Sequence, residues 1–290
     1  MNLKFTKMQG LGNDYIYVNC FDNDVKNQIQ DPANLSIKLS DRHFGVGSDG
    51  LILILPSKKC DARMRMFNSD GSEGKMCGNG IRCVGKFVYD YIFNKDKNKS
   101  SLTIETLSGI KSVNILNDDL ISVDMGKPSL KASQIPVNLA EDIVVNRKVS
   151  MNDNNDYYIT CVSMGNPHCI IFYDDDLEKL DIREIGKEFE RSSLFPEGVN
   201  IEFVKIISND SIRMRVWERG SGETLACGTG ACASVVACIE NGYFSKGMDI
   251  KVILNGGTLY VNYDENDNIY MTGEAKKVFD GIVNIDIERI

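Results

Sequence analysis

Two cysteines with matching neighbours are the candidate acid/base groups of this sequence. Cys77 and Cys227 are 150 positions apart, and each begins a Cys-Gly-X-Gly stretch. Glycines that follow a cysteine let the backbone approach a ligand closely. If a helix begins at each stretch, its dipole favours a bound carboxylate and lowers the pKa of the thiol. The pair is therefore suited to proton transfer beside a bound anion.

The two cysteines belong to an internal repeat. Residues 63–80 read RMRMFNSDGSEGKMCGNG, and residues 213–230 read RMRVWERGSGETLACGTG. Seven of the eighteen aligned positions are identical, namely Arg63/Arg213, Met64/Met214, Arg65/Arg215, Glu73/Glu223, Cys77/Cys227, Gly78/Gly228 and Gly80/Gly230. Weaker echoes, such as Gly12-Asn13 with Gly165-Asn166, follow in the same order. The sequence therefore indicates a duplicated half-molecule.

The duplication predicts two related domains. We expect an N-terminal half over residues 1–126, on which the segment of about 275–290 packs back, and a C-terminal half over residues 127–274. A chain of 290 residues is long enough for two domains of about 145 residues, each with its own core. An approximate two-fold between the halves predicts that Cys77 and Cys227 face each other. A thiolate and a thiol on opposite sides of one carbon could then invert it by removing and returning a proton.

Each cysteine is expected at a transition from strand to helix. Residues 63–67 and 213–217 alternate like strands. Ile81, Val84, Val88 and Tyr91 then recur at helical spacing, and residues 231–239 are apolar or small on every side, which is typical of a buried helix. We predict an α+β fold of two pseudo-symmetric halves. Each is a mostly antiparallel sheet or barrel around a central helix, with the active site in the cleft between them.

Other patterns place the remaining elements. Alternating strands are expected at 102–106, 121–125, 250–254 and 258–263. A helix is expected to start at Asp31-Pro32, which reads as a cap followed by proline at the first helical position, and another is expected over 177–191. The polar stretches 94–101 and 152–156 are expected to be solvated loops.

Composition and charge exclude several classes of protein. The chain is 42% hydrophobic and 26% charged, with a net charge of −8, which is ordinary for a folded soluble protein. No apolar run approaches the roughly 20 residues that span a bilayer, and the N-terminal segment lacks the apolar stretch of a secretory signal. We expect a cytoplasmic protein that does not bind nucleic acid, because phosphate backbones require a basic face. A homodimer is compatible with the sequence.

The nine cysteines do not suggest a disulfide scaffold or a metal centre. Nine is an odd number, and the chain has no recognisable export signal. The spacings around Cys77 and Cys227 lack the Cys-x2-Cys pairs of structural zinc sites, and only His43 and His168 are available as imidazole ligands. We therefore expect no cofactor and no metal, and we expect most of the other cysteines to be small buried hydrophobic residues.

Several motifs resemble those of the diaminopimelate epimerase family over nearly the whole length. They are GLGNDY at 10–15, RHFGVGSDG at 42–50, FNSDGSE at 67–73, MCGNGIRC at 76–83, SMGNPHC at 163–169 and ERGSGETLACGTGACA at 218–233. The resemblance implies cofactor-free interconversion of LL- and meso-diaminopimelate, a small-molecule substrate on the route to lysine and peptidoglycan. It implies that Cys77 and Cys227 are the acid/base pair. It further implies substrate contacts at Asn13, Asn68, Gly78, Asn79, Asn166, Asn200, Glu218, Arg219, Gly228 and Thr229.

These side chains suit a ligand with an ammonium and a carboxylate at each end. Asparagine offers a donor and an acceptor, arginine can bind a carboxylate with two hydrogen bonds, and Glu218 can accept from an ammonium. In the repeat, Glu218-Arg219 aligns with Asn68-Ser69, so the halves differ where an asymmetric substrate must be distinguished. Gly50 stands where some family members have a ligand-binding glutamine, and we assign it no side-chain role.

Other polar residues are expected to have structural roles. We expect His168 to shape its loop rather than act as an acid or base. Glu73 and Glu223 occur in both copies, which favours a structural role near each helix start over a substrate-specific one, although a carboxylate there could also tune the thiol. The strand arginines, Arg63, Arg65, Arg213 and Arg215, are expected on solvated or ion-paired faces.

Two other functions are open from the residues. The first is another amino-acid racemase on the same duplicated fold, such as a proline-racemase-like enzyme, for which Glu218-Arg219 and the asparagines would have no purpose. The second is a thiol–disulfide sensor. Two sulfurs that each contact one carbon at about 3.5 Å stand roughly 7 Å apart, whereas a disulfide needs about 2.05 Å. We therefore expect oxidation to inactivate the protein rather than to signal.

Overall fold

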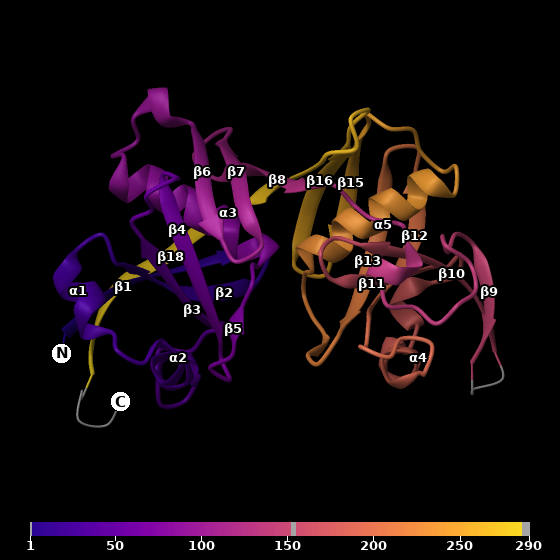
Figure 1. The fold of residues 1–290 in the computed structure, drawn as a ribbon, viewed down its shortest axis with the longest axis horizontal. Helices are drawn as coiled ribbons and strands as arrows, with labels where there is room; N and C mark the ends of the chain where they lie inside the picture. Colours follow the sequence, from indigo (N-terminus) through magenta and orange to yellow (C-terminus); the bar gives the residue numbers. More distant parts are fainter. Residues whose placement is uncertain (1, 152–154, 286–290) are drawn as a thin grey trace. The chain divides into compact units, whose positions relative to one another are not determined.

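The computed structural model describes residues 2–151 and 155–285 and divides into two compact units (Figure 1). Unit 1 comprises Met1–Val123 with Gly273–Ile290, and unit 2 comprises Asp124–Thr272. Each unit is mostly strand and contains one long buried helix. The α+β class and the duplication are therefore confirmed.

Unit 1 is one sheet that curves around a helix. Its elements are β1 (Asn2–Gly10), β2 (Asn13–Asn19), α1 (Asn23–Gln28), α2 (Pro32–Ser40), β3 (Gly50–Leu55), β4 (Ala62–Asn68), β5 (Glu73–Gly74), α3 (Gly78–Phe87), η1 (Val88–Ile92), η2 (Lys97–Lys99), β6 (Ser101–Thr106), β7 (Gly109–Ile115), β8 (Leu120–Gly126, which runs on into unit 2) and β18 (Lys276–Asn284). The strands pair in the order β18-β1-β2-β3-β4-β6-β7-β8, and α3 packs against β1, β2 and β7. The helix that carries the first motif thus packs against strands near both ends of the sheet.

Unit 2 repeats this plan. Its elements are η3 (Ala132–Gln134), β9 (Arg147–Ser150), β10 (Asp156–Ser163), β11 (Pro167–Phe172), η4 (Leu177–Lys179), α4 (Ile182–Arg191), β12 (Asn200–Ser208), β13 (Ser211–Glu218), β14 (Gly222–Glu223), α5 (Gly228–Glu240), β15 (Asp249–Leu254), β16 (Gly257–Tyr263) and β17 (Ile269–Glu274, which runs on into unit 1). From β10 to β16 the pairings are antiparallel, parallel, antiparallel, parallel and antiparallel, as they are from β1 to β7. Helix α5 packs against β10, β11, β12 and β16.

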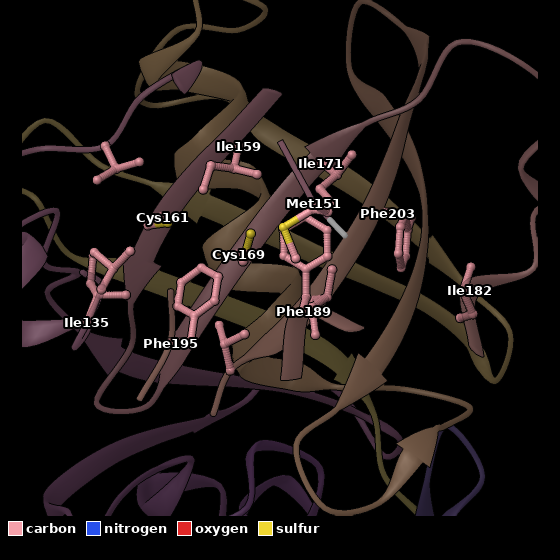
Figure 2. Close-up of a cluster of buried hydrophobic side chains, with 14 of the residues drawn as sticks. Ile135, Met151, Ile159, Cys161, Cys169, Ile171, Ile182, Phe189, Phe195 and Phe203 are labelled. Carbon is pink, nitrogen blue, oxygen red and sulfur yellow. The ribbon is translucent and has the colours of Figure 1, made fainter. Parts of the chain in front are cut away.

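In each unit a cluster of buried apolar side chains packs a helix against the sheet. In unit 1 it joins β1, β2 and β3 to α2 through residues such as Ile16, Leu35 and Leu51. In unit 2, Phe189 of α4 packs with Phe195 and Phe203, and two cysteines of neighbouring strands, Cys161 and Cys169, lie in the same cluster (Figure 2). All cysteines outside the two motifs except Cys60 are buried, as expected of small hydrophobic residues.

The expected strands are present, and so is the helix at Asp31-Pro32, where the Asp31 side chain accepts from the backbone N–H of Asn34. The single helix expected over 177–191 is wrong. The chain forms a short 3-10 turn at Leu177–Lys179 and then α4, because Asp181 caps a new helix by accepting from the N–H groups of Arg183 and Glu184.

The regular part of α3 ends at Phe87, and the expected positions Val88 and Tyr91 continue in a wider π-helical turn. The loop expected at 94–101 contains a short 3-10 turn, and Ser101 already opens β6. Of the loop expected at 152–156, residues 152–154 lie outside the described part of the chain, and Asp156 begins β10.

Candidate active site

Both motif cysteines cap a helix. Cys77 and Cys227 have extended backbone conformations and are the N-cap residues of α3 and α5. Cys77 Sγ accepts from the backbone N–H of Gly80 at 3.3 Å, and Cys227 Sγ accepts from that of Gly230 at 3.4 Å. Each sulfur therefore takes the place that a serine or aspartate oxygen usually occupies at a helix start. At this place the helix dipole stabilises negative charge.

In unit 1, Asn13 binds Cys77. The Cys77 thiol donates to Asn13 Oδ1 at 3.3 Å, and Asn13 Nδ2 donates to Asp49 Oδ2 at 2.8 Å. Arg42 bridges Asp49 and Asp14 with contacts of 2.9 and 2.8 Å. Because Asp49 can only accept when ionised, it turns the Asn13 carbonyl toward the sulfur. Tyr15 is buried beside Cys77. Its pKa is raised well above the usual value, mainly by burial and secondly by the nearby Cys77 sulfur.

A buried cation lies one turn inside α3. Arg82 has no exposed surface. Its Nη2 donates to Asn79 Oδ1 at 2.9 Å, its Nη1 donates to the Gly78 carbonyl at 3.1 Å, and its Nε donates to the Glu274 carbonyl at 3.3 Å. Asn79 itself is only 3% exposed. The predicted contacts Gly78 and Asn79 are thus held by a residue that the sequence analysis did not single out.

Asn68 and Gly50 are paired across β3 and β4. Asn68 Nδ2 donates to Ser72 Oγ at 2.9 Å, so its side chain is held at the end of its strand. A Cβ at Gly50 would lie 2.1 Å from the Phe67 carbonyl oxygen and 2.8 Å from the Tyr15 ring. Only glycine fits there without movement of the backbone, so this chain has no room for a glutamine in the present conformation.

In unit 2, a series of polar contacts connects Cys227 with the buried interior through the side chains of Thr229, Asn166, His168 and Glu202. The Thr229 hydroxyl lies 3.5 Å from Cys227 Sγ and accepts from Asn166 Nδ2 at 3.3 Å. His168 Nε2 lies 3.1 Å from Asn166 Oδ1, and His168 Nδ1 lies 2.7 Å from Glu202 Oε1. His168 and Glu202 are completely buried, and Glu202 Oε2 has no hydrogen-bond partner among the described residues.

The expected place of His168 in a loop is wrong, because the residue lies in β11. Parallel pairing of β11 with β12 sets His168 opposite Asn200, two residues before Glu202. The imidazole nevertheless holds Asn166, which lies in the turn that precedes the strand.

The other predicted contacts of unit 2 gather at the end of β13. Asn200 Nδ2 donates to the Pro167 carbonyl at 3.0 Å, and its Oδ1 accepts from the backbone N–H of Arg219 at 2.9 Å. The Arg219 side chain is exposed and donates to the Glu197 carbonyl at 2.8 Å. Glu218 accepts from the Thr224 hydroxyl at 2.5 Å.

The charges around Cys227 oppose its ionisation in the ligand-free protein. Burial raises the pKa of the Cys227 thiol well above its usual value, and the negative charges of Glu218 and Glu202 add to this effect. Burial also raises the pKa of Glu218, although its hydrogen bond from Thr224 acts in the opposite direction. An ammonium group beside Glu218 would oppose this negative charge, so a cationic ligand suits this place.

The two helix starts have similar backbone conformations but differ in the polar side chains buried next to them. A Cβ at Gly80 would lie 3.0 Å from Ile52 Cδ1, whereas a Cβ at Gly230 would lie 2.5 Å from Glu202 Oε1. Glu202 thus occupies the place that Ile52 has in unit 1. By the repeat alignment Cys232 stands where unit 1 has Arg82. The buried charge therefore sits on the helix in unit 1 and on a strand in unit 2.

The glutamates shared by both copies form ion pairs. Glu73 accepts from Arg65 at 2.7 and 3.0 Å, and Glu223 accepts from Arg215 at 2.9 and 3.1 Å. Each pair joins a long strand, β4 or β13, to the short strand before the helix. This duplicated contact is the structural role that the repeat predicted for the glutamates.

Three buried or ion-paired residues of these sites were missed from the sequence, namely Asp49, Arg82 and Glu202. A signal existed for Arg82, because at the offset of the repeat it aligns with Cys232, so that a charge in one copy stands where the other has a small apolar residue. Among residues 2–151 and 155–285, no helix is long and apolar enough to cross a membrane. In the same residues no three His, Cys, Asp or Glu side chains gather as metal ligands would.

Comparison with known proteins gives a consistent result. The family model described as diaminopimelate epimerase matches residues 5–131 and 160–278. The chain is 52% identical over 288 residues to a diaminopimelate epimerase of Methanococcus maripaludis, covering 98% of this chain and 100% of the relative. It is 50% identical over 289 residues to that of Acetivibrio thermocellus, covering 98% and 99%.

Solved structures share the fold at lower identity. A phenazine biosynthesis protein of the PhzF family from Bacillus anthracis has a TM-score of 0.68 and 20% identity, covering 98% of this chain and 100% of its own. A hydroxyproline epimerase from Agrobacterium vitis has a TM-score of 0.67 and 13% identity, covering 97% and 91%. At this identity the likeness concerns the fold alone.

Proposed function

The chain belongs to the diaminopimelate epimerase family, and from this premise we propose that it interconverts LL- and meso-diaminopimelate with Cys77 and Cys227 as the acid/base pair. The observation that carries the proposal is the duplicated cap, in which each unit holds one cysteine sulfur against the backbone N–H of the third residue of a helix. We place the reaction in the cytoplasm, where its product serves lysine and peptidoglycan synthesis.

The proposed reaction needs one thiolate and one thiol. The thiolate takes the proton from the carbon next to the substrate carboxylate, so that a C–H bond breaks and an S–H bond forms. The second thiol then gives its proton to the opposite face of the same carbon, and its sulfur becomes the thiolate. Protons and electrons balance without a redox partner. Reversal of the direction exchanges the roles of the two cysteines.

Backbone N–H groups at the helix starts stabilise the charge that develops during this transfer. Removing the proton moves negative charge onto the carboxylate oxygens, and donors fixed before the reaction stabilise that charge without reorganising. Gly78 and Asn79 follow Cys77 in α3, and Gly228 and Thr229 follow Cys227 in α5. We assign the reacting carboxylate to these two pairs of residues.

We assign the rest of the ligand to Asn13, Asn68, Asn166, Asn200, Glu218 and Arg219. The half-buried carboxylate of Glu218 suits an ammonium group, and this choice has a consequence for the reaction. A bound ammonium would counter the negative charge that raises the pKa of Cys227. Substrate binding would thereby help Cys227 to become a base. The exposed Arg219 guanidinium suits the carboxylate at the far end.

The direct test is incubation of the purified, reduced protein with LL-diaminopimelate in deuterated water. We expect meso product that carries deuterium at the reacting carbon, and full activity in the presence of a chelator and of a carbonyl trap. L-proline in a parallel reaction should not be racemised. Absence of meso product would overturn the proposed function, and racemisation of proline alone would favour the other racemase class.

A further inference from the structure

The buried guanidinium of Arg82 has a position that the reaction scheme does not explain. It lies one turn inside α3, completely buried, and it reaches back to the first residues of the helix rather than to solvent. Gly10 leaves room for it, since a Cβ there would stand 3.0 Å from Nη2 and 3.2 Å from the Asn79 carbonyl oxygen. Both the strand and the helix are therefore fitted around this group.

The contact with Asn79 fixes the direction of an amide. An asparagine side chain has a donor end and an acceptor end, and a rotation of 180° exchanges them. Arginine has only donors, so the 2.9 Å contact with Nη2 requires the oxygen of Asn79 to face the guanidinium. With its oxygen engaged in this way, the end of the Asn79 amide that faces away from Arg82 carries N–H donors, which is what a carboxylate requires.

The other unit shows why only one helix needs such a cation. The position of Asn79 is occupied by Thr229, and the position of Arg82 is occupied by Cys232. A hydroxyl rotates to donate or to accept as its partner demands, so it needs no fixing group. The Thr229 hydroxyl already has Asn166 Nδ2 and Cys227 Sγ within 3.5 Å. The amide and its cation thus occur together in one unit and are replaced together in the other.

We propose that Arg82 is a positioning residue for the reaction, which holds the Asn79 amide with its N–H groups directed to the substrate carboxylate. The proposal rests on the proposed function, because that function assigns the carboxylate to Asn79. Loss of the guanidinium frees the amide to turn its oxygen toward the carboxylate, which replaces an attraction by a repulsion.

The test is a double-mutant cycle with Arg82→Met and Asn79→Ala, measured as kcat and KM for LL-diaminopimelate. A hydrogen bond to a charged group corresponds to roughly 10- to 100-fold in an equilibrium constant, so we expect Arg82→Met to lower kcat/KM by about that factor. In the Asn79→Ala background the same substitution should have less than about a threefold effect, because the two residues act as one unit. Arg82→Lys should recover only part of the loss, since an ammonium cannot reproduce the fork of donors.

Lys86→Met is the matched control. Lys86 is the next cation on the same face of α3 and is also buried, but it contacts Asp90, Asp119 and the Asp118 carbonyl instead of the motif. The Lys86→Met variant should lower the stability of the fold without the drop in kcat/KM that is expected for Arg82→Met. A drop in Lys86→Met equal to that in Arg82→Met would show that loss of any buried cation suffices, and would overturn the proposal.

A second readout does not depend on catalysis. The side-chain amide signals of Asn79, assigned by their loss in Asn79→Ala, should form one sharp pair in the ligand-free wild type, and should shift or broaden in Arg82→Lys, where the amide can turn. If the losses in kcat/KM of Arg82→Met and Asn79→Ala multiply in the double variant, or if the Asn79 amide signal is unchanged in Arg82→Lys, the proposal is overturned. An active wild type leaves the proposed function intact in either case. A wild type without epimerase activity would overturn the function, and the amide signal would then still report whether Arg82 fixes Asn79.

Discussion

His168 Nδ1 lies 2.7 Å from Glu202 Oε1, and neither side chain has any exposed surface. Because Glu202 takes the place of Ile52 in the other unit, the fold itself accepts an apolar residue there. The pair therefore places polar side chains at a position that is apolar in the other copy of the repeat. His168 binds the amide oxygen of Asn166, whereas in the other unit Asp49 binds the amide nitrogen of Asn13.

The His168–Glu202 pair should behave as a unit in stability measurements. Glu202→Ile leaves a buried imidazole nitrogen without its hydrogen-bond partner, and an unsatisfied buried polar group costs about 1–3 kcal/mol. The double variant Glu202→Ile/His168→Leu should be more stable than the sum of the single losses predicts, by at least about 1 kcal/mol. Urea denaturation of the four proteins measures this, and strict additivity would show that the contact carries no coupling.

Alanine at the third helical position should be tolerated in one unit and not in the other. Gly230→Ala drives a Cβ to 2.5 Å from Glu202 Oε1, an oxygen already bonded to His168, so we expect a loss of about 1–3 kcal/mol. The nearest atom to a Cβ in Gly80→Ala is the terminal methyl of Ile52 at 3.0 Å, which can move, and alanine favours the helix, so the effect on stability should be close to zero. Thermal or urea denaturation of the two variants tests the difference, and equal losses would contradict it.

Alkylation of Cys227 should depend on the charge of Glu218. Burial and two carboxylates raise the pKa of this thiol, so the thiolate fraction is small at neutral pH and rises as the pH increases. Glu218→Gln removes one negative charge, which lowers the pKa and should move the alkylation curve toward lower pH. Iodoacetamide labelling followed by mass spectrometry of the Cys227 peptide gives the curve. A shift toward higher pH would mean that Glu218 does not act through its charge.

The two strand arginines should differ in stability despite their equivalent ion pairs. Arg65 and Arg215 both bind a glutamate with two hydrogen bonds, but only Arg215 also donates to the carbonyls of Leu177 and Leu180, at 2.7 and 2.9 Å. Arg65→Lys should cost at most about 1 kcal/mol, as exposed pairs do. Arg215→Lys should cost about 1–3 kcal/mol more. Similar values for both would show that the carbonyl contacts contribute nothing.

The sequence was sufficient for the repeat, the strands and the position of both cysteines at helix starts, because these depend on short patterns that occur twice. It was not sufficient for contacts set by the register of distant strands. Glu202 meets His168 only because β12 pairs in parallel with β11, and no local pattern fixes that register. Arg82 was read as part of a motif, but its burial depends on Gly10, which lies far away in the sequence. The break before α4 could have been seen, since Asp181 is a standard capping residue.

The central claim is that two thiols share one inversion, and single-cysteine variants test it most directly. Solvent deuterium exchange is measured separately from LL- and from meso-diaminopimelate for wild type, Cys77→Ala and Cys227→Ala, with serine variants as controls for size. We expect each alanine variant to lose exchange with one stereoisomer, in mirror patterns, and both to lose epimerisation. The serine variants should lose epimerisation by orders of magnitude, because serine supplies almost no base at neutral pH. If either cysteine proves dispensable for epimerisation in both directions, the protein uses one base, and the two-thiol account is wrong.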